Sequence, residues 1–419
     1  MDFNEFMRDN LDSEVDKNLK KIREERQYFY PLAEPTYGAE EILEAIDSMV
    51  TFKTSMWEKV RRFEEEFGKK YGGYAVMVNS GSSADLVIAF ALLQKSGGSL
   101  KPGDEILVPA VTWPTHIWSL IMAGFRVKLV DIDVSTLNFN LEKLKSQITP
   151  NTKGVFVVHL LGHTGDLQGL KDLCQDKNLV LLEDCCESLG TKFQGKYVGN
   201  FGLAASFSFF FSHHLVTMEG GMVLTQSLDF AERCRLLRAH GWTRNLRNYN
   251  RGPNSKINAK YEFVNWGFNV RPTELQAGFG LRQLSKADDF HRARRMNAEY
   301  LINRISNHSK HLSTVLPNEF VESSYFAFPI IVKREAPFTR EEFSEFLENN
   351  GIETRPIVAG NLARQPAMSN FPEIYFDDLS NADFIHDFGL YIGIHPEIDN
   401  LKIERVANCI DVFFASKEI

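Results

Sequence analysis

The chain of 419 residues is poor in cysteine, which limits the number of disulfide bonds and of thiolate-bound redox centres that it can contain. Of its five cysteines, only Cys185 and Cys186 are close in sequence. An iron–sulfur cluster is usually held by four thiolates, several of them closely spaced. The spacing also lacks the regular framework of a small disulfide-bonded secreted protein. We therefore expect no iron–sulfur cluster and no disulfide, and we place the protein in a reducing cytoplasm.

Long apolar runs and an excess of positive charge are absent as well. No apolar run approaches the roughly 20 residues of a membrane span, and residues 1–30 are charged and lack the apolar core of a secretory signal. A net charge of -8 disfavours a nucleic-acid surface but allows a local basic pocket. With 43% apolar residues the chain can bury a large core, and its length indicates about two domains.

Lysine is missing from one central stretch, and this absence is the most informative one. No lysine occurs between Lys196 and Lys256. Within this interval, residues 206–221 read Ser-Phe-Ser-Phe-Phe-Phe-Ser-His-His-Leu-Val-Thr-Met-Glu-Gly-Gly. The alternation of Ser206 and Ser208 predicts a strand with a small polar face toward a site. On its own, the stretch is more often a buried aromatic strand with a structural histidine pair and a turn.

In its context the stretch resembles the cofactor-lysine segment of the sugar aminotransferases, pyridoxal-phosphate enzymes of the aspartate-aminotransferase fold that act on nucleotide-linked keto sugars. In that family a lysine stands six residues before the glutamate of a Glu-Gly-Gly turn. Here Glu219 is that glutamate, and His213 occupies the lysine position. Imidazole cannot hold the cofactor covalently, but it is a general base and acid near neutral pH. The resemblance therefore implies non-covalent pyridoxal or pyridoxamine 5'-phosphate and a catalytic His213, with His214 as the alternative in register.

The replacement of lysine by histidine resembles a smaller subgroup, the 3-dehydratases of 3,6-dideoxysugar pathways, and most closely the GDP-4-keto-6-deoxymannose 3-dehydratases of colitose and lipopolysaccharide O-antigen biosynthesis. The similarity runs from about Pro31 onwards. It implies removal of the C3 hydroxyl from a nucleotide-linked 4-keto-6-deoxyhexose, with L-glutamate regenerating pyridoxamine phosphate. An ordinary sugar aminotransferase and a catalytically degenerate binding homologue are the alternatives. The residues alone leave open whether the nucleotide is GDP or CDP and which hexose is bound.

A small-residue turn after a predicted strand is the first candidate cofactor site. Residues 74–78 form this strand, and Asn-Ser-Gly-Ser-Ser follows before an apolar helix. Free N–H groups and the helix dipole make such a turn an anion site, although a plain helix cap is more common. The resemblance places Gly81 and Ser82 at the cofactor phosphate, and it places Trp113 against the pyridine ring.

Further candidate residues follow two other strands and open a later helix. Asp184 ends an apolar strand, where a carboxylate can pair with a protonated pyridine nitrogen. The resemblance puts Glu187 near the cofactor hydroxyl and Ser208 among the cofactor-binding residues. It also implies that Asn269 and Arg271 assist a cofactor or substrate phosphate across a homodimer with shared active sites. The pattern predicts no metal site.

The alternation of strands and helices predicts an α/β fold with a mostly parallel sheet and helices on both faces. The resemblance specifies pyridoxal-phosphate fold type I. We expect an N-terminal helical segment at 1–36, a large cofactor-binding domain at 37–285 and a smaller C-terminal α/β domain at 286–419. The basic loop 242–260 is either a mobile surface loop or a clamp on the phosphates of a sugar nucleotide. Arg355 matches a family position near the substrate.

Overall fold

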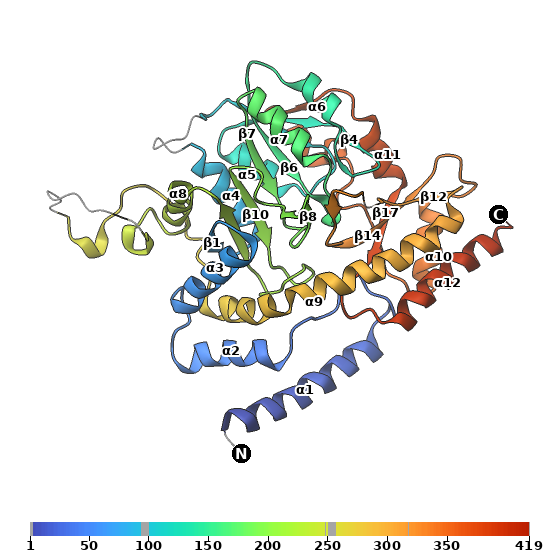
Figure 1. The fold of residues 1–419 in the computed structure, drawn as a ribbon, viewed down its shortest axis with the longest axis horizontal. Coiled ribbons are helices and arrows are strands. Elements are labelled where there is room, and N and C mark those ends of the chain that lie inside the picture. Colours follow the sequence, from blue (N-terminus) through green and yellow to red (C-terminus); the bar gives the residue numbers. More distant parts are fainter. Residues whose placement is uncertain (1–2, 94–99, 248, 250–256, 317, 419) are drawn as a thin grey trace.

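An eight-stranded sheet forms the centre of the computed structural model, which describes residues 3–93, 100–247, 249, 257–316 and 318–418 (Figure 1). Its strand order is β1-β11-β10-β7-β6-β2-β3-β16. Strand β11 is antiparallel to both neighbours, and every other neighbouring pair is parallel. The strands are β1 Tyr74–Val78, β2 Glu105–Pro109, β3 Arg126–Val130, β6 Thr152–Val158, β7 Val180–Asp184, β10 Ala204–Ser208, β11 Gly221–Thr225 and β16 Ile374–Phe376. The predicted mostly parallel sheet is confirmed.

Helices cover both faces of this sheet, as predicted. Alternate strand residues serve opposite faces, so that Val76 and Val78 of β1 belong to one core while Ala75 and Met77 belong to the other. On the first face lie α4 Gly81–Ala91, α5 Thr115–Met122, α8 Leu228–Arg238 and α11 Ser380–Phe388. On the second lie α3 Glu58–Tyr71, α6 Leu141–Gln147, α7 Leu167–Asp176 and the first half of α9 Glu274–Ile305.

A second, four-stranded antiparallel sheet carries the C-terminal part of the chain, in the order β12-β14-β17-β15. It packs with α10 Arg340–Asn349 and α12 Asn400–Ser416 around a third core. Its strands are β12 Leu312–Ser313, β14 Ala327–Val332, β15 Thr354–Pro356 and β17 Gly389–Gly393. The remaining short strands are β4 Ile132–Asp133, β5 Asn138–Phe139, β8 Lys192–Phe193, β9 Lys196–Tyr197 and β13 Val321–Glu322.

Two elements join the large and small parts of the molecule. Helix α9 runs without interruption for 32 residues, through residue 286, where the sequence predicts the border between the domains. Strand β16 comes from the C-terminal part, yet it pairs with β3 at the edge of the large sheet. The division into 37–285 and 286–419 stays a prediction, and these elements tie its two parts together.

The N-terminal helix α1, Phe3–Glu25, lies beside α2, Ala39–Val50, and away from the central sheet (Figure 1). Its C-terminal end is held by the buried Glu34, which pairs with Arg23 at 2.8 Å and Arg26 at 2.6 Å. Burial alone would raise the pKa of Glu34, but the two guanidinium groups lower it to about 2. Among the described residues, no helix is both long and apolar enough to cross a membrane.

Candidate active site

The N-terminus of α4 forms an anion cradle beside the end of β10. Ser80 caps the helix by accepting the N–H of Ser83 at 3.1 Å. The first N–H groups of a helix have no acceptor within it, so those of Gly81 and Ser82 are available to a phosphate. A Cβ at Gly81 would lie 2.6 Å from Cβ of Ser208. Glycine is therefore required for the close approach that brings Gly81, Ser82 and Ser208 together.

Asp184 lies at the carboxyl end of β7, in a buried environment that keeps it ionised. One carboxylate oxygen accepts the N–H of Cys186 at 2.9 Å, and the other lies 3.4 Å from Nδ1 of His116. Burial would raise the pKa of Asp184, but His116 and the N–H of Cys186 lower it below its ordinary value. A buried carboxylate of this kind fits the protonated nitrogen of a pyridine ring.

Glu187 and Trp113 offer two further contacts for a ring. Oε2 of Glu187 accepts the N–H of Leu161 at 2.9 Å. Burial, aided by the charge of Asp184, raises the pKa of Glu187 to about 7, so this carboxyl group carries a proton for part of the neutral pH range. The indole of Trp113 follows β2 and is 55% exposed, which leaves it free to stack on a planar ligand.

His213 is held as a neutral imidazole. Its backbone N–H donates to the carbonyl of Phe210 at 2.9 Å, and its ring packs 5.1 Å from that of Phe326. Burial lowers the pKa of His213 to about 4, although the charge of Asp184 acts in the opposite direction. Its Nδ1 has no hydrogen-bond partner within the described part of the chain. The imidazole is therefore unprotonated at neutral pH, and a ring nitrogen is free to act as a base toward a bound ligand.

Unlike that of His213, the side chain of His214 is fully buried and makes structural contacts. It is 1% exposed, and its Nε2 lies 3.2 Å from the carbonyl oxygen of Ser324. Its ring packs 5.6 Å from that of His291. These contacts favour His213 over His214 as the reactive imidazole.

Asn269 and Arg271 lie on a separate surface, in a groove of about 1120 Å³. Nε of Arg271 donates to Oδ1 of Asn269 at 2.8 Å. None of the other predicted site residues is among those that line this groove, although the carbonyl of Val270 accepts the N–H of Asn79, near the start of α4, at 3.1 Å. Arg244 joins Asn269 and Arg271 from the loop 242–260, of which residues 248 and 250–256 lie outside the described part. Glu64 in the groove pairs with two of its arginines, Arg238 and Arg247. The charged residues that line the groove are Arg61, Arg62, Arg235, Arg238, Arg244, Arg247, Arg271, Glu58, Glu64 and Glu65.

Sequence reasoning gave no role to Asp85 and His116, which the structure places next to Asp184. Their polar side-chain atoms and that of Asp184 lie within 4.8 Å of one another. Both residues stand in otherwise apolar helices, which is a signal that the sequence does contain. Phe326, which packs on His213, was also missed, because its position far along the chain carries no local signal. Arg355, by contrast, pairs with Glu353 at 2.8 Å, and its role near a substrate stays a prediction.

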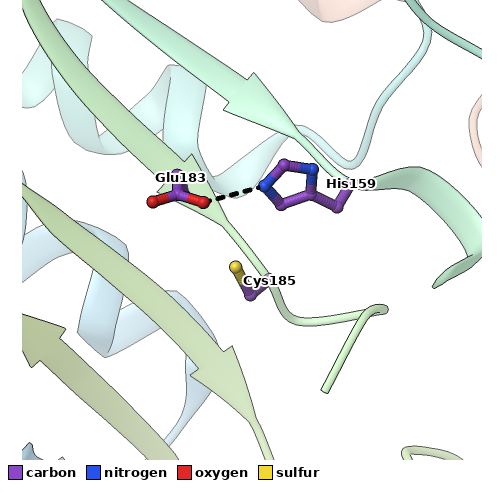
Figure 2. A group of neighbouring side chains, drawn as sticks. All are labelled: His159, Glu183 and Cys185. Atoms are coloured by element: carbon purple, nitrogen blue, oxygen red, sulfur yellow. Dashed lines mark hydrogen bonds and ion pairs between the residues drawn. The ribbon is translucent and has the colours of Figure 1, made fainter. Parts of the chain in front are cut away.

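A second polar group, His159, Glu183 and Cys185, lies on the other face of the sheet (Figure 2). Glu183 is a hydrogen-bond centre: Oε2 faces Nε2 of His159 at 3.1 Å and accepts the N–H of Gly199 at 2.7 Å. Its Oε1 accepts the N–H groups of Phe201 and Gly202, each at 2.7 Å. Since both oxygens are already engaged, the group serves the fold rather than a metal ion.

Comparison of the chain with known proteins identifies its family. Residues 35–411 match the DegT/DnrJ/EryC1/StrS aminotransferase family. The chain is 40% identical over 385 residues to GDP-4-keto-6-deoxy-D-mannose 3-dehydratase of Escherichia coli O55:H7, covering 89% of this chain and 98% of the relative.

Two crystal structures of GDP-4-keto-6-deoxymannose-3-dehydratase match with a TM-score of 0.86. One, a mutant with bound GDP-perosamine, is 38% identical and covers 91% of this chain and 100% of its own. The other holds a trapped PLP–glutamate geminal diamine, at 37% identity and coverages of 91% and 99%. The predicted pyridoxal-phosphate type I fold is confirmed, and the chain belongs to the DegT/DnrJ/EryC1/StrS aminotransferase family.

Proposed function

We propose that this protein is a pyridoxamine-phosphate-dependent 3-dehydratase that converts GDP-4-keto-6-deoxymannose to a 4-keto-3,6-dideoxysugar. The observation that carries the proposal is His213 at the position of the family lysine, in a chain without lysine from 197 to 255. Relatives with the same activity in their names are similar to this chain over nearly their whole length.

The residues around β7 and β10 fit the cofactor. Gly81, Ser82 and Ser208 would hold its phosphate, while Asp184 would pair with the ring nitrogen. Glu187 would face the ring hydroxyl, and Trp113 would stack on the ring. When bound, the cofactor supplies an amine for the 4-keto carbon of the sugar and a ring that takes up electrons.

His213 moves the protons of the reaction. As a neutral imidazole it takes a proton from the methylene carbon of the cofactor, and it can return that proton to the departing C3 hydroxyl. Hydrolysis would yield ammonia and the deoxygenated sugar, and L-glutamate would regenerate the amine form of the cofactor with release of 2-oxoglutarate. Because His213 has no amine, the cofactor stays non-covalently bound throughout.

The arginine-lined groove supports a shared site in a homodimer. Asn269 and Arg271 lie in this groove, which none of the other predicted site residues lines. We propose that they reach the phosphate groups of cofactor or substrate in the partner's site, and that Arg244 binds the nucleoside diphosphate there. Arginine suits phosphate because its fork of N–H groups donates two parallel hydrogen bonds. We also propose a cytoplasmic location, in keeping with five free cysteines.

The deciding experiment is the absorbance spectrum of the purified protein with pyridoxal phosphate, before and after L-glutamate, together with borohydride trapping. We expect conversion to the pyridoxamine spectrum and no cofactor fixed to the chain by borohydride. GDP-4-keto-6-deoxymannose should then be consumed with formation of 2-oxoglutarate. A trapped lysine adduct would restore the aminotransferase alternative, and a failure to bind the cofactor would favour a degenerate binding homologue.

A further inference from the structure

Behind the predicted ring-nitrogen site, a second carboxyl group lies next to Asp184. Asp85 comes from α4 and His116 from α5, and both side chains are 0% exposed. Atoms of Asp85, His116 and Asp184 lie within 4.8 Å of one another. Three elements that are far apart in sequence thus bring two acids and an imidazole together in a buried space.

Two negative charges so close together in a dry interior repel each other strongly, so one carboxyl group holds a proton. The contacts decide which one does. Asp184 receives the Cys186 N–H at 2.9 Å and faces Nδ1 of His116 at 3.4 Å. Asp85 accepts the hydroxyl of Thr115 at 3.1 Å, and its Oδ1 has no hydrogen-bond partner among the described residues. The negative charge is therefore better solvated at Asp184.

The other groups that face Asp85 do not reverse this assignment. Ser206 of β10 and Thr115 of α5 present hydroxyl groups to it, and the thiol of Cys186 is influenced by its charge. Burial, followed by the charge of Asp184, raises the pKa of Asp85 well above its ordinary value. Burial and the charge of Asp184 likewise raise the pKa of the Cys186 thiol, which stays protonated. The hydroxyl oxygen of Ser206, which is also 0% exposed, has no hydrogen-bond partner in the described structure and can accept a hydrogen bond from the protonated carboxyl group of Asp85.

We propose that Asp85 is a positioning residue that remains a neutral carboxylic acid and, together with His116, confines the single negative charge of this cluster to Asp184. As a neutral hydrogen-bonding group, Asp85 fills the space behind Asp184 without competing with Asp184 for the protonated ring nitrogen of the cofactor. The negative charge that pairs with the ring nitrogen therefore stays on the carboxylate of Asp184, and this carboxylate keeps one orientation. This consequence for the ring rests on the proposed function, whereas the proton on Asp85 does not.

Infrared spectroscopy of the apoprotein tests the proton directly. At neutral pH we expect a buried protonated carboxyl band that ¹³C-aspartate labelling shifts and that is absent in Asp85→Asn; a band from Glu187 is told apart because aspartate labelling leaves it in place. The matched control is Glu64→Gln, since Glu64 is also buried, at 4% exposed, but is ion-paired with Arg238 at 2.6 Å and should contribute no such band. If the apoprotein lacks the band, or if Asp85→Asn retains it, the inference is wrong, whatever the cofactor does.

Equilibrium dialysis of pyridoxal phosphate tests the positioning role. Asparagine mimics the neutral acid, so Asp85→Asn should hold the cofactor within about threefold of wild type. Asp85→Ala leaves a gap and should weaken binding by about tenfold or more. Equal weakening in both variants, or none in Asp85→Ala, would overturn the positioning role. Wild-type protein that binds no cofactor would count against the proposed function but leave the infrared result intact.

Discussion

Replacing Glu183 by glutamine should destabilise the large domain severely, although the side chain keeps its size. The carboxylate receives three N–H groups at 2.7 Å and faces His159 at 3.1 Å. Glutamine has only one oxygen, so its NH₂ group must face at least one buried N–H donor. The least damaging orientation turns the NH₂ group to His159 and Gly199, which leaves the N–H of Gly199 unpaired.

The magnitude follows from these contacts. One buried unpaired donor costs about 1–3 kcal/mol, and each of the two remaining bonds loses about 1 kcal/mol when its acceptor becomes neutral. The sum is about 3–5 kcal/mol, a large part of the roughly 5–15 kcal/mol that stabilises a typical protein. Because a chain of this size need not unfold in one step, a local measurement is better than a melting temperature.

Hydrogen exchange of the peptide that contains Gly199, Phe201 and Gly202 supplies that measurement. A loss of about 3 kcal/mol corresponds to exchange more than a hundredfold faster where opening limits exchange. The control is Glu322→Gln, which removes a partly exposed ion pair with Lys192 at 3.0 Å and should change stability by less than about 1 kcal/mol. Exchange as slow in Glu183→Gln as in this control would refute the reasoning.

The pH dependence provides a second check on Glu183. Burial opposes its ionisation, but His159 and the N–H groups of Gly199 and Gly202 lower its pKa below the ordinary 4.5. Its stabilising contribution is therefore complete above about pH 4.5 and is lost as the pH falls through the lower folded-state value. The difference between wild type and Glu183→Gln should shrink in acid. A difference that grows in acid would contradict the assigned charge state.

Three further outcomes are expected. His213→Lys should allow borohydride to fix pyridoxal phosphate to the chain and should abolish dehydration; sustained dehydration would remove His213 from its role. Phe326→Ala should lower kcat about tenfold or more, because it frees the imidazole, while cofactor binding in dialysis stays unchanged; an unaltered kcat would show that the packing is dispensable. Glu34→Gln should release Arg23 and Arg26, at the C-terminal end of α1, from residue 34 and speed proteolysis of α1; cleavage of the variant at the wild-type rate would argue against that anchor.

Local patterns were sufficient to predict most of the sheet. Strand β1 occupies residues 74–78 as expected, β7 ends at Asp184 as expected, and β10 contains Ser206 and Ser208 as expected. These strands are apolar runs bounded by turns, a pattern that can be recognised in the sequence without knowledge of the tertiary fold. The pairing of β16 with β3 could not be predicted, because three residues near position 375 carry too little pattern to reveal a partner about 250 residues away.

The candidate site was predicted where a family motif could be aligned and missed where only packing creates it. His213 stands at a motif position, so a resemblance was enough to single it out. Asp85 and His116 became visible only when α4 and α5 were packed on one face of the sheet. The choice between His213 and His214 likewise depends on Ser324, which is distant in sequence but supplies the carbonyl oxygen that engages the second imidazole.

Glu183 and Asp184 are neighbours in strand β7, yet we expect the first to stabilise the fold and the second to bind the cofactor. Successive side chains of a strand point to opposite faces, so Glu183 meets His159 on one face and Asp184 meets Asp85 and His116 on the other. The first carboxylate is saturated by protein N–H groups, whereas the second keeps room for a cation. Glu183→Gln should therefore loosen the apoprotein, and Asp184→Asn should weaken pyridoxal phosphate binding with little change in exchange at residues 199–202. Equal effects of both substitutions on exchange and on binding would show that the two faces are not separate.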